Sequence, residues 1–279
     1  MSTHVAAKTQ TDERHLLVRL FSSFNSSLMP RIPTPEELYH PVANHPVETI
    51  ANLDRVPIED NREPLVDLRR ACPDLRLRPL NRSNLRARQS VAQRLNEVQL
   101  WLDTHHPGHH LVIIDAWRSD RMQRRGNFYG RTFLRLLHPN WPKSLIREAA
   151  NKYIADPDAL APPPHSTGGA IDVRLDNAQG RCNLQGPRLK LSASRTDYSP
   201  LPEKARQGRE ILCAAMEHAG FSNYEEEWWH WSYGDSGWAL RSNQPKACYG
   251  RACNFDSVLD FHTYDVSPNL ETNKVNQTD

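Results

Sequence analysis

The chain has 279 residues, with 35 lysines and arginines against 33 aspartates and glutamates, so its net charge is +2. This balance predicts no steering of the whole molecule toward nucleic acid or a membrane surface. No apolar run approaches the roughly 20 residues that a membrane helix needs, and the start of the chain lacks a signal-peptide pattern. Five irregularly spaced cysteines indicate free thiols, so we expect a cytoplasmic protein with no nucleic-acid and no membrane partner; the oligomeric state stays open.

The first sixty residues are predicted to be an extension. Residues 1–30 are polar apart from HLLVRLF, and residues 31–63 are rich in proline, which favours a tail followed by an ordered wrap or a linker. We therefore divide the chain into a partly flexible N-terminal extension at 1–61, a catalytic domain at 62–250 and a C-terminal tail at 251–279.

The body of the chain mixes strand and helix patterns. A helix is predicted over 83–106, where Ser83 is placed as the cap, and the β-branched run HLVIIDAW predicts a buried strand. The other patterns are strands at 64–70, 75–80, 170–175 and 227–234, helices at 121–137, 142–154 and 203–220, and a loop at 161–169. This mixture lacks a regular alternation, so we expect an α+β fold with a mixed or antiparallel sheet covered by helices.

Two segments carry residues that bind metals. HSTGGAIDV places His165 seven residues before Asp172, and EEEWWHWSYGD holds His230. Two imidazoles and one carboxylate, with a fourth position left for water, form the ligand set of a catalytic zinc site. Glycines at 168 and 169 would let the loop fold back, so that the first two ligands converge. The sequence therefore predicts one Zn²⁺ per chain.

Glu227 and Arg118 complete the predicted site. Glu227 precedes His230 by three residues, so a straight strand would point their side chains to opposite faces. Glu227 can act on a metal-activated water only if the backbone bends there, at a bulge or a strand entry. Arg118 follows a buried strand, where its guanidinium can face a cleft and stabilise an oxyanion.

Each of these residues also has an ordinary structural interpretation. His230 amid tryptophans is typical of a packed core histidine, and Arg118 of an ion pair. His165 and Asp172 could instead order the loop that holds them.

Neighbouring residues are predicted to have no part in the chemistry. Glu225 and Glu226 are expected to face solvent, and the adjacent tryptophans to form core and pocket wall. The run HHPGHH joins a helix to a strand, which favours an exposed loop over a metal site. Cys248 and Cys253 lack the further ligands of a zinc ribbon and are predicted to be free thiols.

The segments HSTGGAIDV, EWWH and DAWR resemble motifs of the D-alanyl-D-alanine dipeptidases of vancomycin-resistance type. They look like that family's His-x6-Asp, Glu-Trp-Trp-His and Asp-x-Tyr/Trp-Arg motifs, in the same order, over about residues 62–250. The resemblance implies a zinc D-Ala-D-Ala peptidase-like fold, shared with D,D-carboxypeptidases, that hydrolyses D-alanyl-D-alanine. It also matches His165, Asp172 and His230 to the zinc ligands, Glu227 to the catalytic base and Arg118 to the arginine that stabilises the transition state.

Three departures from the family pattern concern the substrate pocket. Pro163 stands where family members often carry serine, an Asn-Phe-x-Gly segment is missing, and Asp197 matches the amine-binding aspartate only after an insertion. We expect the pocket walls to come from the segment 119–155 and the N-terminal wrap. Besides a dipeptidase for a small D-amino-acid dipeptide, two alternatives stay open: a D,D- or L,D-carboxypeptidase on cell-wall peptides, and a catalytically silent zinc-binding module.

Overall fold

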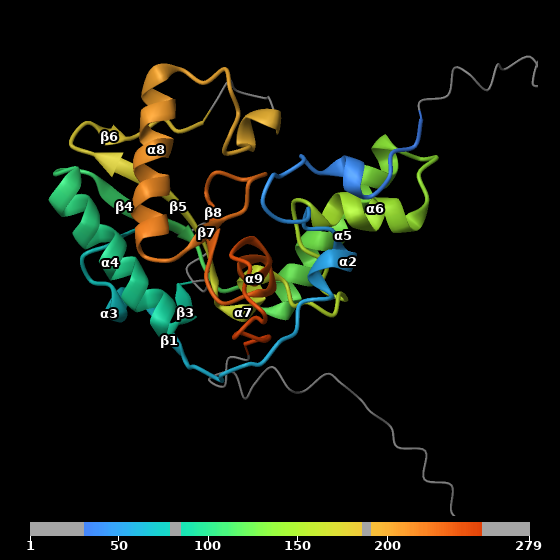
Figure 1. Cartoon of the computed structure of the whole chain (residues 1–279), viewed down its shortest axis with the longest axis horizontal. Coiled ribbons are helices and arrows are strands. Elements are labelled where there is room, and N and C mark those ends of the chain that lie inside the picture. Colours follow the sequence, from blue (N-terminus) through green and yellow to red (C-terminus); the bar gives the residue numbers. More distant parts are fainter. Residues whose placement is uncertain (1–30, 79–84, 186–190, 253–279) are drawn as a thin grey trace, which may run out of the picture.

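The computed structural model describes residues 31–78, 85–185 and 191–252, and a six-stranded sheet lies at its centre (Figure 1). The strands are β2 (Arg76–Leu77), β4 (His110–Asp115), β5 (Ala170–Asn177), β6 (Gly180–Arg181), β7 (Ser222–Asn223) and β8 (His230–Ser232). They run in the order β2-β4-β5-β8-β7, and β6 pairs with β5 outside this path. β2 and β4 are parallel, whereas the other pairs are antiparallel. The predicted α+β class with a mixed sheet is confirmed.

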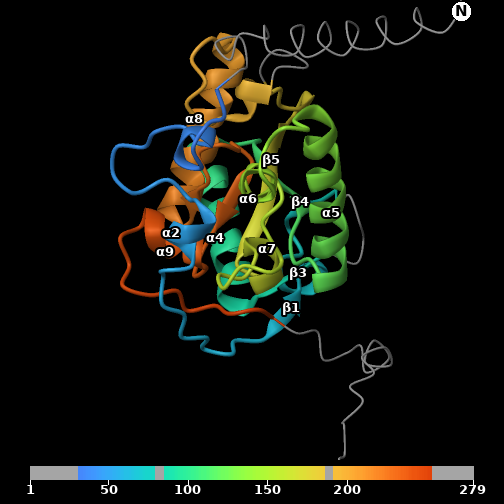
Figure 2. The ribbon, with the colours of Figure 1, turned by 90° about the vertical axis from the view of Figure 1, so that its right-hand side faces the viewer.

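Helices lie on both sides of this sheet (Figures 1 and 2). One side carries α4 (Gln89–His105) and α8 (Glu203–His218), and the other side carries α2 (Ile50–Leu53), α5 (Asp120–Leu137) and α6 (Lys143–Asn151). The shorter elements are α3 (Leu68–Ala71), α7 (Pro164–Thr167), α9 (Ser236–Arg241), two 3-10 turns at Glu36–Leu38 and Leu191–Ser194, and the antiparallel pair β1 (Leu65–Asp67) and β3 (Arg86–Arg88). None of the described helices has both the length and the apolar content needed to cross a bilayer.

The hydrophobic core fills the space between α4, α8 and the sheet. Val91, Leu95, Val98 and Leu102 recur every three or four residues along α4, so all four face one side, and none of them is accessible to solvent. They join a core cluster with alternate residues of β5 and with residues of α8, among them Ile171, Val173, Leu175, Leu212 and Met216. This packed half gives the site-bearing strands β5 and β8 a rigid support.

Several predicted elements differ from the observed ones. The strand predicted over 64–70 is confined to Leu65–Asp67, because Asp67 caps the helix α3 that follows at Leu68–Ala71. The helix predicted from residue 83 begins at Gln89, after the strand β3, and Ser83 lies outside the described residues. The predicted loop at 161–169 contains the helical turn α7, which Pro164 can begin because proline lacks only an N–H that a first turn leaves unpaired. The strand predicted over 227–234 is confined to His230–Ser232.

The segment from residue 34 to 61 packs against the body as an ordered wrap. The Tyr39 hydroxyl donates to Glu148 Oε1 at 2.7 Å, and the Ile50 N–H donates to the same atom at 3.1 Å. Lys152 Nζ donates to the Leu38 carbonyl at 2.8 Å. These polar contacts hold the wrap against α6, on the side of the sheet where the metal-binding motifs lie.

Candidate active site

The two strands at the centre of the sheet place the predicted metal ligands side by side. Asp172 on β5 pairs directly with His230 on β8, so the two side chains start from neighbouring positions. His165 lies in α7, and Gly168 ends that turn with a φ of 75°. A Cβ at Gly168 would lie 2.4 Å from Leu65 Cδ2, so the fold-back that returns the chain to β5 requires glycine there.

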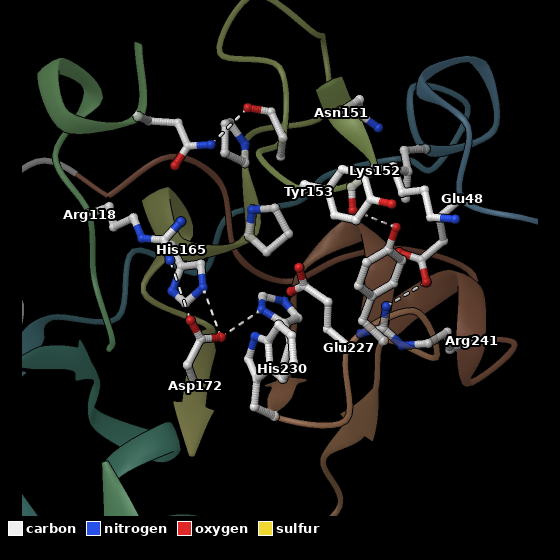
Figure 3. Close-up of a pocket in the computed structure, with 17 residues that line it drawn as sticks. Glu48, Arg118, Asn151, Lys152, Tyr153, His165, Asp172, Glu227, His230 and Arg241 are labelled. Carbon is white, nitrogen blue, oxygen red and sulfur yellow. Dashed lines mark hydrogen bonds and ion pairs between the residues drawn. The ribbon is translucent and has the colours of Figure 1, made fainter. Parts of the chain in front are cut away.

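The side chains of His165, Asp172 and His230 converge and are buried. One ligand atom from each lies within 4.8 Å of the other two. His230 Nδ1 is 3.0 Å and His165 Nε2 is 3.3 Å from Asp172 Oδ1 (Figure 3). The three residues thus form one compact cluster of the kind expected for a metal centre.

This donor set fits a zinc ion. His165 Nδ1 lies 2.6 Å from the Ala116 carbonyl, which assigns the proton to Nδ1 and leaves the Nε2 lone pair facing Asp172. A lone pair and a carboxylate oxygen are both acceptors, and a cation between them satisfies both. Two imidazoles and one carboxylate are also the ligand set of catalytic zinc sites.

The electrostatics favour the protonation states that bind metals. Burial alone would raise the pKa of Asp172, but the interactions of its carboxylate with His165 and His230 outweigh burial and lower it below its usual range. Burial lowers the pKa of His230 more than Asp172 raises it. Asp172 is therefore ionised and His230 neutral near pH 7, as metal coordination requires.

Glu227 reaches the same site because the backbone turns between residues 227 and 230. The His230 N–H donates to the Glu227 carbonyl at 3.0 Å, which closes a turn immediately before β8. The bend that the sequence required at a strand entry is therefore confirmed. Burial raises the pKa of Glu227 well above its usual range, the charge of Asp172 adds to the rise, and Arg118 offsets part of it.

Arg118 is held beside the cluster by two carboxylates. Its Nε donates to Asp115 Oδ2 at 2.7 Å, and its Nη2 donates to Asp172 Oδ2 at 3.3 Å. Burial alone would lower the pKa of Arg118, but Asp115 and Asp172 raise it overall, so the guanidinium stays charged. Its side chain is 23% exposed, which leaves part of the fork open to the cavity.

One cavity of about 130 Å³ collects all five predicted site residues (Figure 3). Its walls also include Glu48 and Leu53 from the wrap, and Gln123, residues 151–153 and Ala155 from the segment after Arg118. Both predicted wall segments therefore contribute. Sequence reasoning missed individual wall residues, namely Glu48, Lys152, Tyr153, Tyr224 and Arg241.

Comparison with known proteins identifies the family to which the chain belongs. A sequence model of the D-Ala-D-Ala dipeptidase family matches residues 81–250, more than half of the chain. The chain belongs to the D-Ala-D-Ala dipeptidase family. This dipeptidase-family chain is 29% identical over 224 residues to the D-alanyl-D-alanine dipeptidase of Synechocystis sp., an alignment that covers 68% of this chain and 89% of that protein.

Solved structures similar to this dipeptidase-family chain are more distant. A vancomycin-resistance D,D-pentapeptidase in complex with Zn(II) is 13% identical, with a TM-score of 0.36 over 71% of this chain and 96% of that one. An LD-carboxypeptidase whose structure reveals the basis of peptidoglycan recognition is 18% identical, with a TM-score of 0.38 over 67% of this chain and 77% of that one. The family places this chain among the metallopeptidases, with Zn²⁺ as cofactor.

Some predictions around the dipeptidase-family site are wrong. Glu226 was expected to face solvent, yet it is buried, because its carboxylate accepts from the His40 N–H at 2.6 Å and pairs with Lys152 at 2.9 Å. Asp197 pairs with Arg195 at 2.5 Å, is largely exposed and is absent from the cavity lining.

Other predictions agree with the described structure. Glu225 is partly exposed, with 44% of its side chain accessible, while Trp228 and Trp231 are buried and Trp229 lines the cavity. Among the residues that the structure describes, HHPGHH contributes to no close group of metal-binding atoms. Cys248 is unpaired, and Cys253 lies outside the described ranges.

Proposed function

We propose that this chain hydrolyses D-alanyl-D-alanine, with His165, Asp172 and His230 as zinc ligands, Glu227 as general base and Arg118 as the stabiliser of the transition state. The observation that carries the proposal is the meeting of these five side chains in one small cavity, in a chain of the D-Ala-D-Ala dipeptidase family. Their chemical types supply each step that peptide hydrolysis needs.

Glu227 handles the proton in this mechanism. Zinc bound at the three ligands would polarise the peptide carbonyl and acidify a water molecule. The Glu227 carboxylate accepts a proton from the attacking water and delivers it to the leaving nitrogen. Its burial and the charge of Asp172 raise its pKa, which makes the carboxylate a stronger base than an exposed glutamate.

Arg118 and the cavity walls orient the substrate. The Arg118 fork is fixed by Asp115 and Asp172, so its donors are already aimed when negative charge develops on the carbonyl oxygen. The cavity is small, at about 130 Å³, which suits a short substrate such as a dipeptide. Glu48 and Leu53 restrict it on the side of the wrap.

We further propose a cytoplasmic enzyme that takes part in the turnover of cell-wall peptides, whose catalytic unit is residues 62–250. Residues 31–61 serve as an extension that completes the pocket. The cytoplasmic location is supported by four unpaired cysteines in the described part of the chain.

The decisive experiment measures hydrolysis of D-alanyl-D-alanine by the full chain, with and without a zinc chelator. We expect activity that the chelator removes and zinc restores. Glu227→Gln should reduce kcat by at least about 10²-fold while zinc stays bound at one ion per chain, because the variant removes the proton acceptor and leaves the ligands in place.

The matched control is Glu225→Gln, which removes a neighbouring carboxylate outside the cavity lining and should leave kcat unchanged. Full activity in Glu227→Gln would refute the mechanism. Release of D-alanine from a pentapeptide but not from the dipeptide would identify a carboxypeptidase. Stoichiometric zinc without hydrolysis of either peptide would identify a silent binding module.

A further inference from the structure

The outward side of α5 carries large apolar side chains that nothing in the described structure covers. Five of them cluster in the second half of the helix, with exposed fractions of 55% to 76%: Phe128, Tyr129, Phe133, Leu136 and Leu137. We call these five residues the α5 apolar face. Figure 2 shows α5 along the outer edge of the molecule, where a flat surface can reach it.

The buried residues on the inner side of α5 explain why its apolar side chains face outward. The buried residues of α5 are Gln123 and Asn127, one turn apart. Their side-chain amides donate to the carbonyls of Ala155 at 2.7 Å and Ile154 at 2.8 Å. These two hydrogen bonds attach the inner side of α5 to the body. The positions of the two amides therefore orient the apolar residues of the helix outward. Large apolar side chains that gather on one exposed helix face mark an interaction site.

The charge around the patch identifies the partner as anionic. Residues 121–147 contain seven lysines and arginines and no aspartate or glutamate, whereas the whole chain has a net charge of only +2. Of these seven, Arg124 and Arg147 form ion pairs, while the other five form no ion pair with a described carboxylate: Arg121, Arg125, Arg131, Arg135 and Lys143. The balanced net charge of the whole chain predicted no membrane partner. Residues 121–147 nevertheless carry a strong local excess of positive charge.

The groove between α5 and α6 extends the basic surface. It measures about 530 Å³, and four cations line it with Phe128 and Ile146: Arg124, Arg131, Arg135 and Lys143. Its one carboxylate, Asp158, is paired with Arg124, so the groove keeps an excess of positive charge. Aromatic and aliphatic side chains beside arginines are the composition of helices that lie at a membrane interface. The apolar chains enter the boundary of the acyl region, while the guanidinium groups stay at the level of the phosphates.

A second copy of the chain does not suit the α5 apolar face. In a twofold contact the same basic segment would face itself, and residues 121–147 provide no carboxylate to compensate seven positive charges across the axis. An anionic lipid surface has both the negative charge and the apolar interior that the face requires.

We propose that the α5 apolar face and the basic segment 121–147 attach this protein reversibly to membranes that contain anionic phospholipid. The attachment uses one helix lying on the surface and does not involve the catalytic cavity. It is independent of the substrate proposed above.

The test is sedimentation of the full chain with vesicles of phosphatidylcholine alone or mixed with phosphatidylglycerol. We expect binding to the anionic vesicles that weakens as salt is raised, and little binding to the neutral ones. Phe133→Ser with Leu136→Ser, and separately Arg121→Gln with Arg131→Gln, should each weaken binding by at least about ten-fold. These four residues lie outside the catalytic cavity, so dipeptide hydrolysis and thermal stability report correct folding.

Leu100→Ser is the matched control, because Leu100 is 68% exposed on α4, on the other side of the sheet, and its loss should leave binding unchanged. Equal binding to both vesicle types, or none at low salt, would overturn the proposal. Binding to polyglutamate without binding to vesicles would replace the membrane with an acidic protein. A dimer that the α5 variants dissociate would assign the face to a second copy, and vesicle binding that emerges only when residues 253–279 are deleted would assign it to that segment.

Discussion

At Arg118, two ion pairs fix a guanidinium whose free donors face the cavity. Asp115 holds Nε and Asp172 holds Nη2, so the plane of the side chain is set before substrate arrives. A preorganised donor contributes more to catalysis than a mobile one, because no reorganisation is needed when charge develops.

Replacing Arg118 with lysine should separate geometry from charge. Lysine keeps the positive charge but lacks the planar fork that spans both carboxylates. We expect kcat for the dipeptide to fall by about 10²–10³-fold, with a smaller change in KM and with zinc content unchanged. Arg124→Lys, in an exposed ion pair, should leave kcat within two-fold. Equal kcat values for Arg118→Lys and wild type would limit Arg118 to a structural role.

The pair of His45 in the wrap and Glu225 in the body makes the stability of the fold depend on pH. The carboxylate of Glu225, 3.8 Å from His45 Nε2, raises the pKa of His45 above its ordinary 6.5, more than burial lowers it. Since the folded-state value is the higher one, the pair stabilises the fold fully below pH of about 6.5 and loses this contribution as the pH rises through the raised pKa.

The free energy of unfolding of wild type and His45→Gln should therefore differ at pH 6 and converge by about pH 8. The difference should stay below about 1 kcal/mol, because Glu225 is partly exposed and solvent screens the pair. Urea unfolding at both pH values measures it. A difference that grows with pH would contradict the assignment.

At the scale of elements, the wrap depends on a buried carboxylate on α6. Glu148 accepts hydrogen bonds from the Tyr39 hydroxyl and from the Ile50 N–H, one on each side of the segment that carries Glu48. Tyr39 and Glu148 are both buried, so water does not readily replace a lost partner.

Tyr39→Phe should therefore lower the free energy of unfolding by about 1–2 kcal/mol and raise KM for the dipeptide, because the wall that holds Glu48 loosens. Tyr129→Phe is the control, because the Tyr129 side chain is exposed. Loss of its hydroxyl should change neither the free energy of unfolding nor KM. Urea unfolding and steady-state kinetics give both readouts. An unchanged KM in a destabilised Tyr39→Phe would show that the wrap does not shape the pocket.

Long elements and contiguous motifs could be predicted from the sequence, but short or distant contacts could not. The helix α4 spans almost five turns, so its apolar period was visible, whereas β3 and α7 have three and four residues and show no full period. His165 and Asp172 share one motif, so their convergence needed only a turn at Gly168.

The missed residues depend on partners far along the chain. Glu226 is buried because its partners are Lys152 and the His40 N–H, which lies 186 residues away. Glu48 enters the cavity wall because it pairs with Arg241, which lies 193 residues away. No local pattern reveals such pairs, because only the folded chain brings them together.

At the scale of the whole molecule, the pair of Glu48 and Arg241 ties the first described segment to the last helix. The two groups are 2.7 Å apart and almost fully buried. Arg241 also donates to the Ser222 and Ser232 hydroxyls, so it is held from β7 and β8 as well. A Cβ at Gly237 would lie 2.8 Å from both Arg241 Nη1 and Glu48 Oε2, so the pair also needs glycine in α9.

Replacing one partner of this pair should lower the free energy of unfolding more than replacing both partners. Glu48→Gln leaves a buried guanidinium without its charge partner, and we expect the free energy of unfolding to fall by about 3 kcal/mol. Glu48→Gln combined with Arg241→Met should recover part of that loss, since no unpaired charge remains. Urea unfolding of Glu48→Gln, of Arg241→Met and of the double variant completes the cycle, and strictly additive losses would show that the two groups do not interact.

The polar fastening of α5 has one more consequence, for motion. Because the buried side chains of α5 are two amides, the helix gains less from hydrophobic burial than α4 does, and we expect it to open locally at a lower free energy. Its amide hydrogens are then expected to exchange sooner than those of α4, whose apolar stripe is sealed in the core. Because Gln123 belongs both to that fastening and to the cavity wall, each such opening would widen the passage through which a dipeptide enters and its products leave.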